Sequence, residues 1–315
     1  VFSTWLNGGN AGGAAQIAGV VLMLIFLLVA LERISRRGAR FHAGARAHRP
    51  VERQRLRGPA AALAFAACAA PVLSGFVLPV AVMLWHSARA PDQWLAPGLV
   101  KALANTLTVA GLASLATVAA AVFLVYGIRL AGRGAARLVL PLTTLGYATP
   151  GAVLAVGLLF PLAALDHRLA DAILALTGRD PGLMITGTAF ALGLAYLVRF
   201  FGIAQGAVDG AFGRVSPSLP MAARSLGRTA GGALAAVYLP LMRRSVLVAL
   251  LVVFVDCVKE LPATLLLRPF NYNTLATRVF ELASLERLSE AAPAALLVMA
   301  VGLAAVAVMA KGEGR

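Results

Sequence analysis

Long uncharged apolar runs alternate with short polar segments along the whole chain of 315 residues. A helix needs about 20 apolar residues to cross the hydrocarbon core of a bilayer. Seven runs approach or exceed that length, at residues 14–31, 59–85, 102–128, 138–165, 181–198, 245–267 and 291–310. The pattern predicts an all-α integral membrane protein, a polytopic helical bundle. Kinks are expected at Pro71, Pro79, Pro150 and Pro161, because proline removes an intrahelical hydrogen bond.

Composition supports a membrane protein and argues against nucleic acid as a partner. The chain is 60% hydrophobic and 13% charged, whereas an ordinary globular chain carries about 25% charged residues. Its net charge is +15, but most basic residues lie in short segments between apolar runs. A nucleic-acid site needs them gathered on a folded, water-exposed face.

The distribution of positive charge predicts an orientation. Residues 32–58, 129–137, 199–244 and 311–315 hold 20 of the 28 Lys and Arg residues but only four acids. Loops rich in Lys and Arg stay in the cytoplasm. We therefore expect the N-terminal end of this chain outside and the C-terminus in the cytoplasm. The arginine-rich part of the first segment is expected to anchor the topology beside anionic membrane lipid.

Enzymatic, metal-binding and nucleotide-binding motifs are absent from the sequence. It contains no His-Glu-x-x-His and no Gly-x-Ser-x-Gly, so an integral membrane enzyme is disfavoured. It also lacks Gly-x-x-x-x-Gly-Lys-Ser/Thr, so this chain is not expected to bind ATP or another cofactor itself. Cys68 and Cys257 both lie in apolar runs and are expected to be small buried side chains. No metal ligands are assigned.

Residues 202–244 are predicted to form a cytoplasmic loop far longer than a helix connection requires. Ser216 and Pro217 are a suitable N-cap and first residue for a short helix. Gly227 permits a sharp turn after it. The helix would carry a small apolar face made of Ala222, Ala223 and Leu226. Such a helix either docks on a partner or lies on the bilayer surface.

The spacing in this loop resembles a known signature. Leu219-Pro-Met-Ala-Ala-Arg-Ser-Leu-Gly227, nine residues and then Val237-Tyr-Leu-Pro240 resembles the signature of ABC importer permeases: Glu-Ala-Ala, three residues, Gly, nine residues, Ile-x-Leu-Pro. Met221 stands where that signature has Glu. The resemblance implies that the short helix docks in a groove of a separate ABC ATPase dimer, which binds and hydrolyses ATP. The residues implied in this coupling are Met221, Ala222, Ala223, Leu226, Gly227, Leu239 and Pro240.

Three further stretches, residues 147–157, 258–270 and 274–283, resemble ferric-iron permeases of this importer class. The implied fold is the type I transmembrane domain of ABC importers, and the implied function is import of ferric iron across the bacterial inner membrane. Residues 1–31 would be the last span of a preceding half, 32–58 a basic cytoplasmic linker, and 59–315 a complete six-span second half. A periplasmic binding protein, and the other permease half or a second permease copy, would be its partners.

Other cargoes and another class of transporter remain open from the sequence. Thiamine, polyamine, sulfate and phosphonate permeases share this fold and loop. An ion-coupled secondary transporter would explain the spans but leaves the loop signature unexplained.

Charged residues interrupt the sixth apolar run at Asp256, Lys259 and Glu260. A charge deep in the membrane costs at least about 2.5 kcal/mol, so it should face a cavity or a partner. One hypothesis places the two acids on the iron route, because ferric iron prefers oxygen ligands. The other is an internal Asp256–Lys259 pair that holds a gate near Pro262. Downstream, residues 268–290 are predicted to form an outer amphipathic helix, which either meets the binding protein or caps the bundle.

Overall fold

The computed structural model describes residues 1–313 except 2, 37–54, 133, 135–138 and 141. Every regular element within these residues is a helix, as predicted. Six helices are long and apolar enough to cross a membrane by length and composition. The chain is therefore an all-α multi-pass membrane protein.

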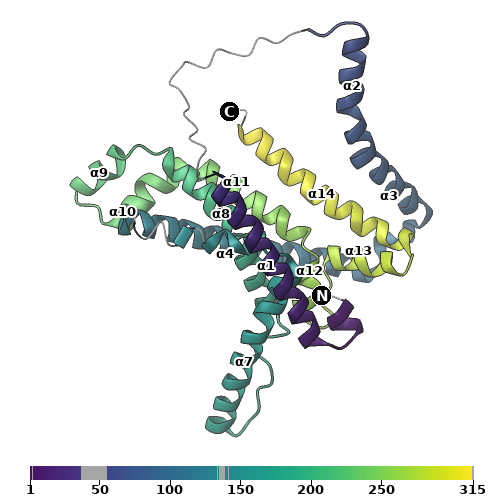
Figure 1. Ribbon diagram of the computed structural model, residues 1–315, viewed down its shortest axis with the longest axis horizontal. Coiled ribbons are helices and arrows are strands. Elements are labelled where there is room, and N and C mark those ends of the chain that lie inside the picture. The colour runs from purple at the N-terminus through teal and green to yellow at the C-terminus, as the bar shows by residue number, and fades with distance from the viewer. Residues whose placement is uncertain (2, 37–54, 133, 135–138, 141, 314–315) are drawn as a thin grey trace.

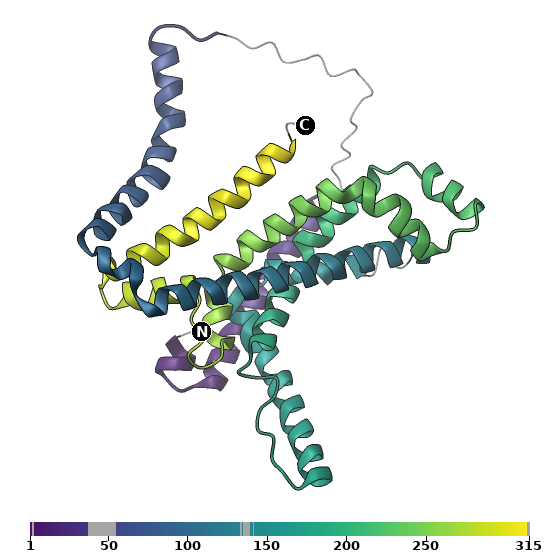
Figure 2. The same cartoon turned by 180° about the vertical axis from the view of Figure 1, so that it is seen from behind.

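Three long helices form the centre of the molecule: α4 (Pro97–Ala131), α8 (Ala189–Gly213) and α11 (Leu239–Val258). They pack against one another and lie side by side in both views (Figures 1 and 2). Buried alanines line the contacts, together with Tyr196 and Phe212. Small residues suit this packing because membrane helices associate through close van der Waals contact rather than through a hydrophobic driving force.

A second group of helices surrounds this centre. The π turn η1 (Ser3–Asn7) precedes α1 (Ala11–Arg36), which packs against α7 (Gly151–Thr177). The short turn η3 (Pro91–Leu95) leads into α4. At the other end of the chain, α13 (Leu275–Ser284) packs on α14 (Leu288–Glu313), and α14 contacts α11. The predicted seventh span lies within α14.

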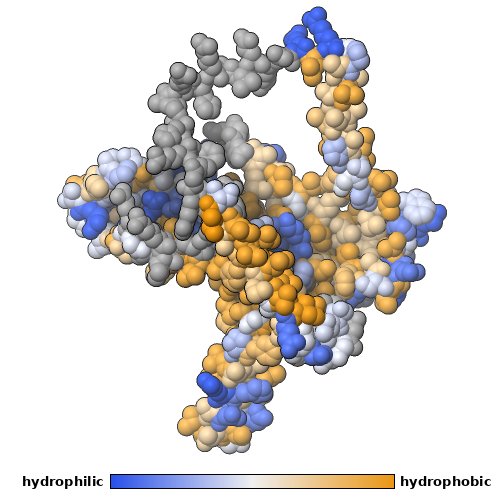
Figure 3. Space-filling model, viewed as in Figure 1, coloured by the Kyte–Doolittle hydropathy of each residue, from blue (hydrophilic) through white to orange (hydrophobic). Residues whose placement is uncertain are grey.

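One helical arm packs on α14 at its C-terminal end and stands away from the bundle at its N-terminal end (Figures 1 and 2). It consists of α2 (Pro59–Val72), the π turn η2 (Leu73–Val77) and α3 (Leu78–Arg89). The widened turn lies between Pro71 and Pro79, where two backbone N–H donors are missing. None of the arm's most apolar stretch is buried. Figure 3 shows a largely apolar surface, with hydrophilic residues gathered at the free ends of α2 and α7 and around α9 (Ser218–Ser225).

The predicted fourth span, 138–165, is not one continuous helix. The described part contains α6 (Leu145–Ala148), a break at Thr149 and Pro150, and then α7. Pro150 has an extended ψ of 139°. Pro161, by contrast, lies inside α7 without ending it.

The predicted start of the fifth span at residue 181 is also wrong. Residues before Ala189 fold back on α7 rather than entering the helix. Asp166 of α7 is fully buried and accepts hydrogen bonds from the backbone N–H groups of Met184, Ile185 and Thr186, at 2.9, 2.9 and 2.6 Å. These bonds stabilise the segment in a non-helical conformation and satisfy a buried charge.

The 43-residue loop predicted at 202–244 is much shorter in the structure. Helix α8 continues to Gly213, the short helix α9 (Ser218–Ser225) lies in the remaining connection, and α10 (Ala230–Ala233) and the π turn η4 (Leu234–Tyr238) lead into α11. Polar and glycine residues suggested a loop there, but Gln205 and Asp209 remain in α8 and contact Thr143 and Arg129. Membrane helices tolerate such residues where neighbouring helices pack against them.

The sixth predicted span, 245–267, is broken as well. Helix α11 starts earlier, at Leu239, and ends at Val258, and α12 (Pro262–Leu267) follows after a three-residue gap. Helix α11 is not among the six helices of membrane-span composition, since it carries Arg243, Arg244 and Asp256. It nevertheless packs inside the bundle against α4, α8 and α14.

Candidate functional site

The short helix predicted from the loop signature is present at one end of the bundle, far from α13 (Figure 1). This helix is α9 (Ser218–Ser225), with Pro217 as its N-cap residue, so it begins one residue later than predicted. Gly227 ends it with a positive φ of +83°. The N–H of Arg228 donates to Ala223 O at 3.1 Å and the N–H of Gly227 to Arg224 O at 3.0 Å. This pair of bonds defines a Schellman turn, which favours glycine.

Most apolar side chains of α9 and of its C-cap residue are uncovered, although Pro220 is buried. Met221 is 66% exposed, Leu226 86% and Leu219 48%. Ala222 is also exposed, and Ala223 is half-buried. A cluster of exposed large apolar side chains on an otherwise polar helix end indicates a contact surface.

Residues 229–238, which follow α9 and are called here the base of α9, join this helix to the bundle. The Tyr126 hydroxyl of α4 donates to Ala230 O at 2.6 Å, and the Thr229 side chain accepts from Gly232 N. Tyr126 also packs on Phe212 and Tyr238, at ring-centroid distances of 5.9 and 5.7 Å. These contacts connect the segment that follows α9 to α4 through Tyr126 and to α8 through Phe212. The predicted coupling residues Leu239 and Pro240 form the first turn of α11, next to this base.

A buried ion pair lies deeper in the bundle. Arg199 Nε is 3.1 Å from Glu260 Oε2, and the two side chains are 17% and 6% exposed. Arg199 Nη1 donates to Thr149 O at 2.9 Å, and Glu260 Oε1 accepts from Ala263 N at 3.1 Å. The break between α6 and α7 and the break between α11 and α12 thus meet at this ion pair. Non-helical backbone inside a membrane protein requires such internal partners.

Two glycines allow the backbone of α6 and α7 to lie close to Glu260 and to α8 at this junction. A Cβ on Gly151 would lie 2.5 Å from Glu260 Oε1, and one on Gly146 would lie 2.1 Å from Val198 O. The carboxylate of Glu260 is placed at the start of α12, and the guanidinium of Arg199 at the carbonyl end of α6. Each charge has the sign that complements the local peptide dipoles.

The four predicted path or gate residues divide into two groups. Lys259 Nζ lies 2.7 Å from Asp256 Oδ1, so the predicted internal pair is present. Glu260 does not join that pair and forms an ion pair with Arg199. Pro262 starts α12 immediately after the break. In the described part of the chain, no three His, Cys, Asp or Glu side chains are grouped to hold a metal ion.

Sequence reasoning missed Arg199 and misplaced one cysteine. The charge pattern predicts Arg199 in a loop, but it is the eleventh residue of the 25-residue helix α8. The apolar run that continues on both sides of it was the available signal. Cys257 is buried as predicted, whereas Cys68 is exposed because the arm has no neighbour on that side.

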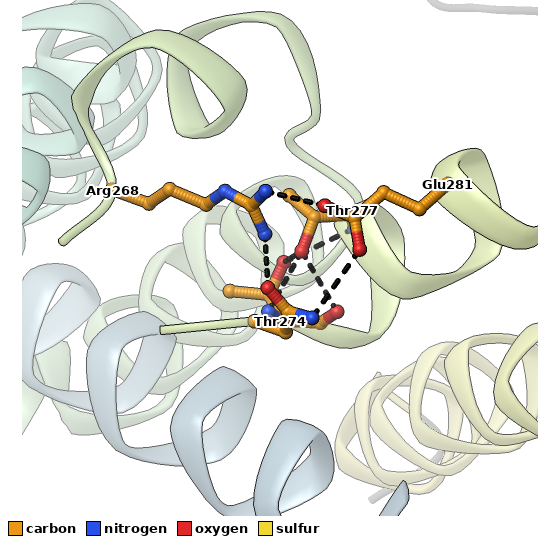
Figure 4. A network of polar contacts seen from close by, with 5 residues as sticks. Arg268, Thr274, Thr277 and Glu281 are labelled. Atoms are coloured by element: carbon orange, nitrogen blue, oxygen red, sulfur yellow. Dashed lines mark hydrogen bonds and ion pairs between the residues drawn. The ribbon is translucent and has the colours of Figure 1, made fainter. Parts of the chain in front are cut away.

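At the opposite end from α9, a polar network fixes the connection between α12 and α13 (Figure 4). Arg268 donates to Asn273 Oδ1 and forms an ion pair with Glu281. Thr274 and Thr277 form a reciprocal capping box that begins α13. Helix α13 covers only residues 275–284 of the predicted stretch 268–290, and it packs on α14 and α4. Phe270, in the connection, is 94% exposed.

Solved structures define the class of this fold. No protein-family model matches the chain. A bacterial alginate ABC transporter, solved in complex with an alginate pentasaccharide-bound periplasmic protein, superimposes with a TM-score of 0.62 over 80% of this chain and 92% of the other, at 13% identity. A bacterial ABC transporter involved in import of the acidic polysaccharide alginate gives 0.61 over 80% and 94%, at 16% identity. The chain has the fold of an ABC transporter permease.

A sequence relative supports the more specific resemblance. The chain is 26% identical over 301 residues to the Fe(3+)-transport system permease protein FbpB 2 of Haemophilus influenzae, covering 90% of this chain and 54% of the relative. This chain therefore spans about half the length of the curated relative it matches. The match confirms the resemblance to ferric-iron permeases inferred from the motifs. The relative is a transport component rather than an enzyme, as expected for this chain.

Proposed function

We propose that this chain is a transmembrane permease subunit of an ATP-driven ABC importer in the bacterial inner membrane. The observation that carries the proposal is α9, a short helix with uncovered apolar side chains and a Schellman turn at Gly227. Its sequence matches the importer signature at the positions that form the turn and the small-residue face. A helix lying on the bilayer surface would not require that spacing.

In this proposal, Met221, Ala222, Ala223 and Leu226 dock in a groove of an ABC ATPase subunit. ATP is bound and hydrolysed there, and the base of α9 transmits the movement to the bundle. The α9 end would be cytoplasmic. Arg214, Arg224 and Arg228 lie at that end, in agreement with the preference of basic loops for the cytoplasm.

The proposed domain organisation places residues 1–31 in a preceding half and 59–315 in a second half. Residues 37–54 of the proposed linker lie outside the described residues. The length of the relative supports this division, since 54% of it is covered. The preceding half, or a second permease copy, would complete the transmembrane assembly.

Ferric iron delivered by a periplasmic binding protein is the proposed cargo. The relative's name supports it, and the charged breaks at Asp256, Lys259, Glu260 and Pro262 would form part of the path or its gate. The structural neighbours carry no argument for cargo, because their low identity bears on the fold alone. Thiamine, polyamine, sulfate and phosphonate remain the alternatives to test.

The proposal is tested with the full-length permease, its ATPase and its binding protein in cells. Uptake of radiolabelled ferric iron is measured for the wild type and for Gly227→Pro. Proline fixes φ near −65°, which is incompatible with +83°, so uptake should fall by at least about tenfold while the permease stays in the membrane. Gly231→Ala is the control, because open space surrounds that position.

Two results would change the conclusion. If Gly227→Pro transports iron at the wild-type rate, α9 is not a coupling element. If the wild type imports no ferric iron but its ATPase responds to another cargo from the alternatives, the importer class stands and the cargo is wrong.

A further inference from the structure

Two adjacent cavities open at the α9 end, where α8 ends and α11 begins. Their volumes are about 310 and 390 Å³. Arg214 and Ser245 line both. We refer to the two cavities together as the basal groove.

The mouth of the basal groove is cationic. Arg214 Nη2 donates to Ser245 Oγ at 2.8 Å, and Arg244 lines the first cavity. No acidic side chain lines either cavity. Across the described part of the chain, no carboxylate forms an ion pair with Arg214 or Arg244. Guanidinium groups with free N–H donors bind phosphate oxygens with charge-assisted hydrogen bonds.

The wall of the first cavity is apolar and runs along α11 and α14. Its lining comprises Leu247, Val248 and Leu251 of α11 with Val308 and Met309 of α14. Arg244 and Leu251 are seven residues apart, or about 10 Å along a helix. Leu247 and Val308 are 49% and 50% exposed. Cationic side chains next to an apolar wall of this length are suited to bind an amphiphile, whose charged head would meet the arginines and whose tail would lie along the wall.

We propose that the basal groove binds an anionic phospholipid, with its phosphate between Arg214 and Arg244 and its acyl chains along Leu251 and Val308. Basic pockets at the cytoplasmic ends of membrane helices are suited to acidic lipid headgroups. A free phosphate ion would leave the apolar wall unused, and a soluble protein partner would not reach into the hydrocarbon region.

The position of the groove gives the lipid a role in coupling. The second cavity is also lined by Leu219 of α9 and by Ser216 just before it. A bound lipid would therefore contact the N-terminal end of α9 as well as α11 and α14. It would hold that end at the membrane surface while the rest of α9 stays free for a partner.

The test is native mass spectrometry of the full-length permease assembled with its ATPase. Phosphatidylglycerol and phosphatidylcholine of identical chains are titrated into separate samples. The wild type should retain phosphatidylglycerol preferentially. The double variant Arg214→Gln/Arg244→Gln should lose about tenfold in that binding, because two charge-assisted contacts are removed.

Arg243→Gln is the matched control. Arg243 is exposed on the same helix and adjacent in sequence, but it does not line the groove, so its substitution should leave phosphatidylglycerol binding unchanged. Val308→Trp should reduce lipid binding by narrowing the apolar wall. Size-exclusion profiles of all variants check that each is folded.

Three outcomes would overturn the proposal. Equal binding of the two lipids would mean that the groove does not select an anionic lipid. A loss in Arg243→Gln equal to that in the double variant would mean that non-specific surface charge accounts for the binding. Competition by millimolar inorganic phosphate, with no effect of Val308→Trp, would indicate a site for a soluble anion. Lipid retention is measured without ATP or iron, so its failure is distinguishable from failure of the proposed import function.

Discussion

Arg199 and Glu260 form a buried ion pair where two helix breaks meet. Each side chain also satisfies a backbone group at a helix break. Removing one partner leaves a buried charge without compensation, which typically costs about 3–5 kcal/mol. Removing both costs less, since no charge is left behind.

We therefore expect Arg199→Gln to lower the thermal unfolding temperature of the purified full-length permease more than Arg199→Gln/Glu260→Gln does. Arg129→Gln is the control, because the Arg129–Asp209 pair is 38% and 42% exposed and such pairs contribute at most about 1 kcal/mol. An unfolding temperature of Arg199→Gln equal to that of the Arg129→Gln control would show that the junction does not stabilise the bundle.

Gly151 provides a second test of the same junction. A methyl group there would lie 2.5 Å from Glu260 Oε1, so Gly151→Ala should separate the ion pair and destabilise the permease by about 1–3 kcal/mol. Gly157→Ala, on the same helix with open space around it, should be neutral or stabilising, since alanine is the better helix former. Equal unfolding midpoints in urea for these two variants would contradict the prediction.

The sequence predicted the local pair and missed the long-range one. Asp256 and Lys259 are three residues apart, and helical spacing alone brings them together. Glu260 and Arg199 are separated by 61 residues in the chain, and no periodicity relates them. Their contact depends on how closely α6 and α8 pack, which the glycines at 146 and 151 determine only in three dimensions.

Among the elements, helix existence was predicted well and helix ends poorly. Apolar runs located most of the long helices, but they could not locate the breaks after α6 and α11. A break inside a bundle is stable only when neighbouring side chains bond the freed backbone groups. Those partners come from other helices, such as Arg199 for Thr149 O. The short helix α9 was found because its spacing signature includes the turn glycine.

The apolar side of α9 yields a prediction about partner binding. Leu226 is 86% exposed, so Leu226→Asp should leave the permease folded while it weakens ATPase association by about tenfold or more, as loss of an apolar anchor does. Co-purification of the ATPase measures this. Ser218→Asp is the control, because an acid in the first turn of a helix is favourable. Undiminished ATPase recovery with Leu226→Asp would exclude α9 as the docking element.

At the scale of the whole molecule, the arm formed by α2, η2 and α3 is the candidate membrane span with the least buried surface. Its most apolar stretch has no buried residue, and the chain covers about half of its relative. Within the described part of the chain the arm meets the bundle through α3, which packs on α14, whereas α2 makes no comparable contact with another long helix. We infer that the preceding half of the permease packs against the arm.

Cys68, exposed on α2, can report on that packing. A membrane-permeant maleimide should label Cys68 readily in this chain alone, and several-fold more slowly in the full-length permease, in which the other half would cover α2. Cys257→Ser removes the buried second thiol in both samples, and Cys68→Ala gives the background. In the full-length protein, any cysteine of the preceding half must be replaced as well. Equal labelling rates in the two proteins would mean that lipid, rather than the other half, covers the arm. The proposed two-half assembly would then need a different interface.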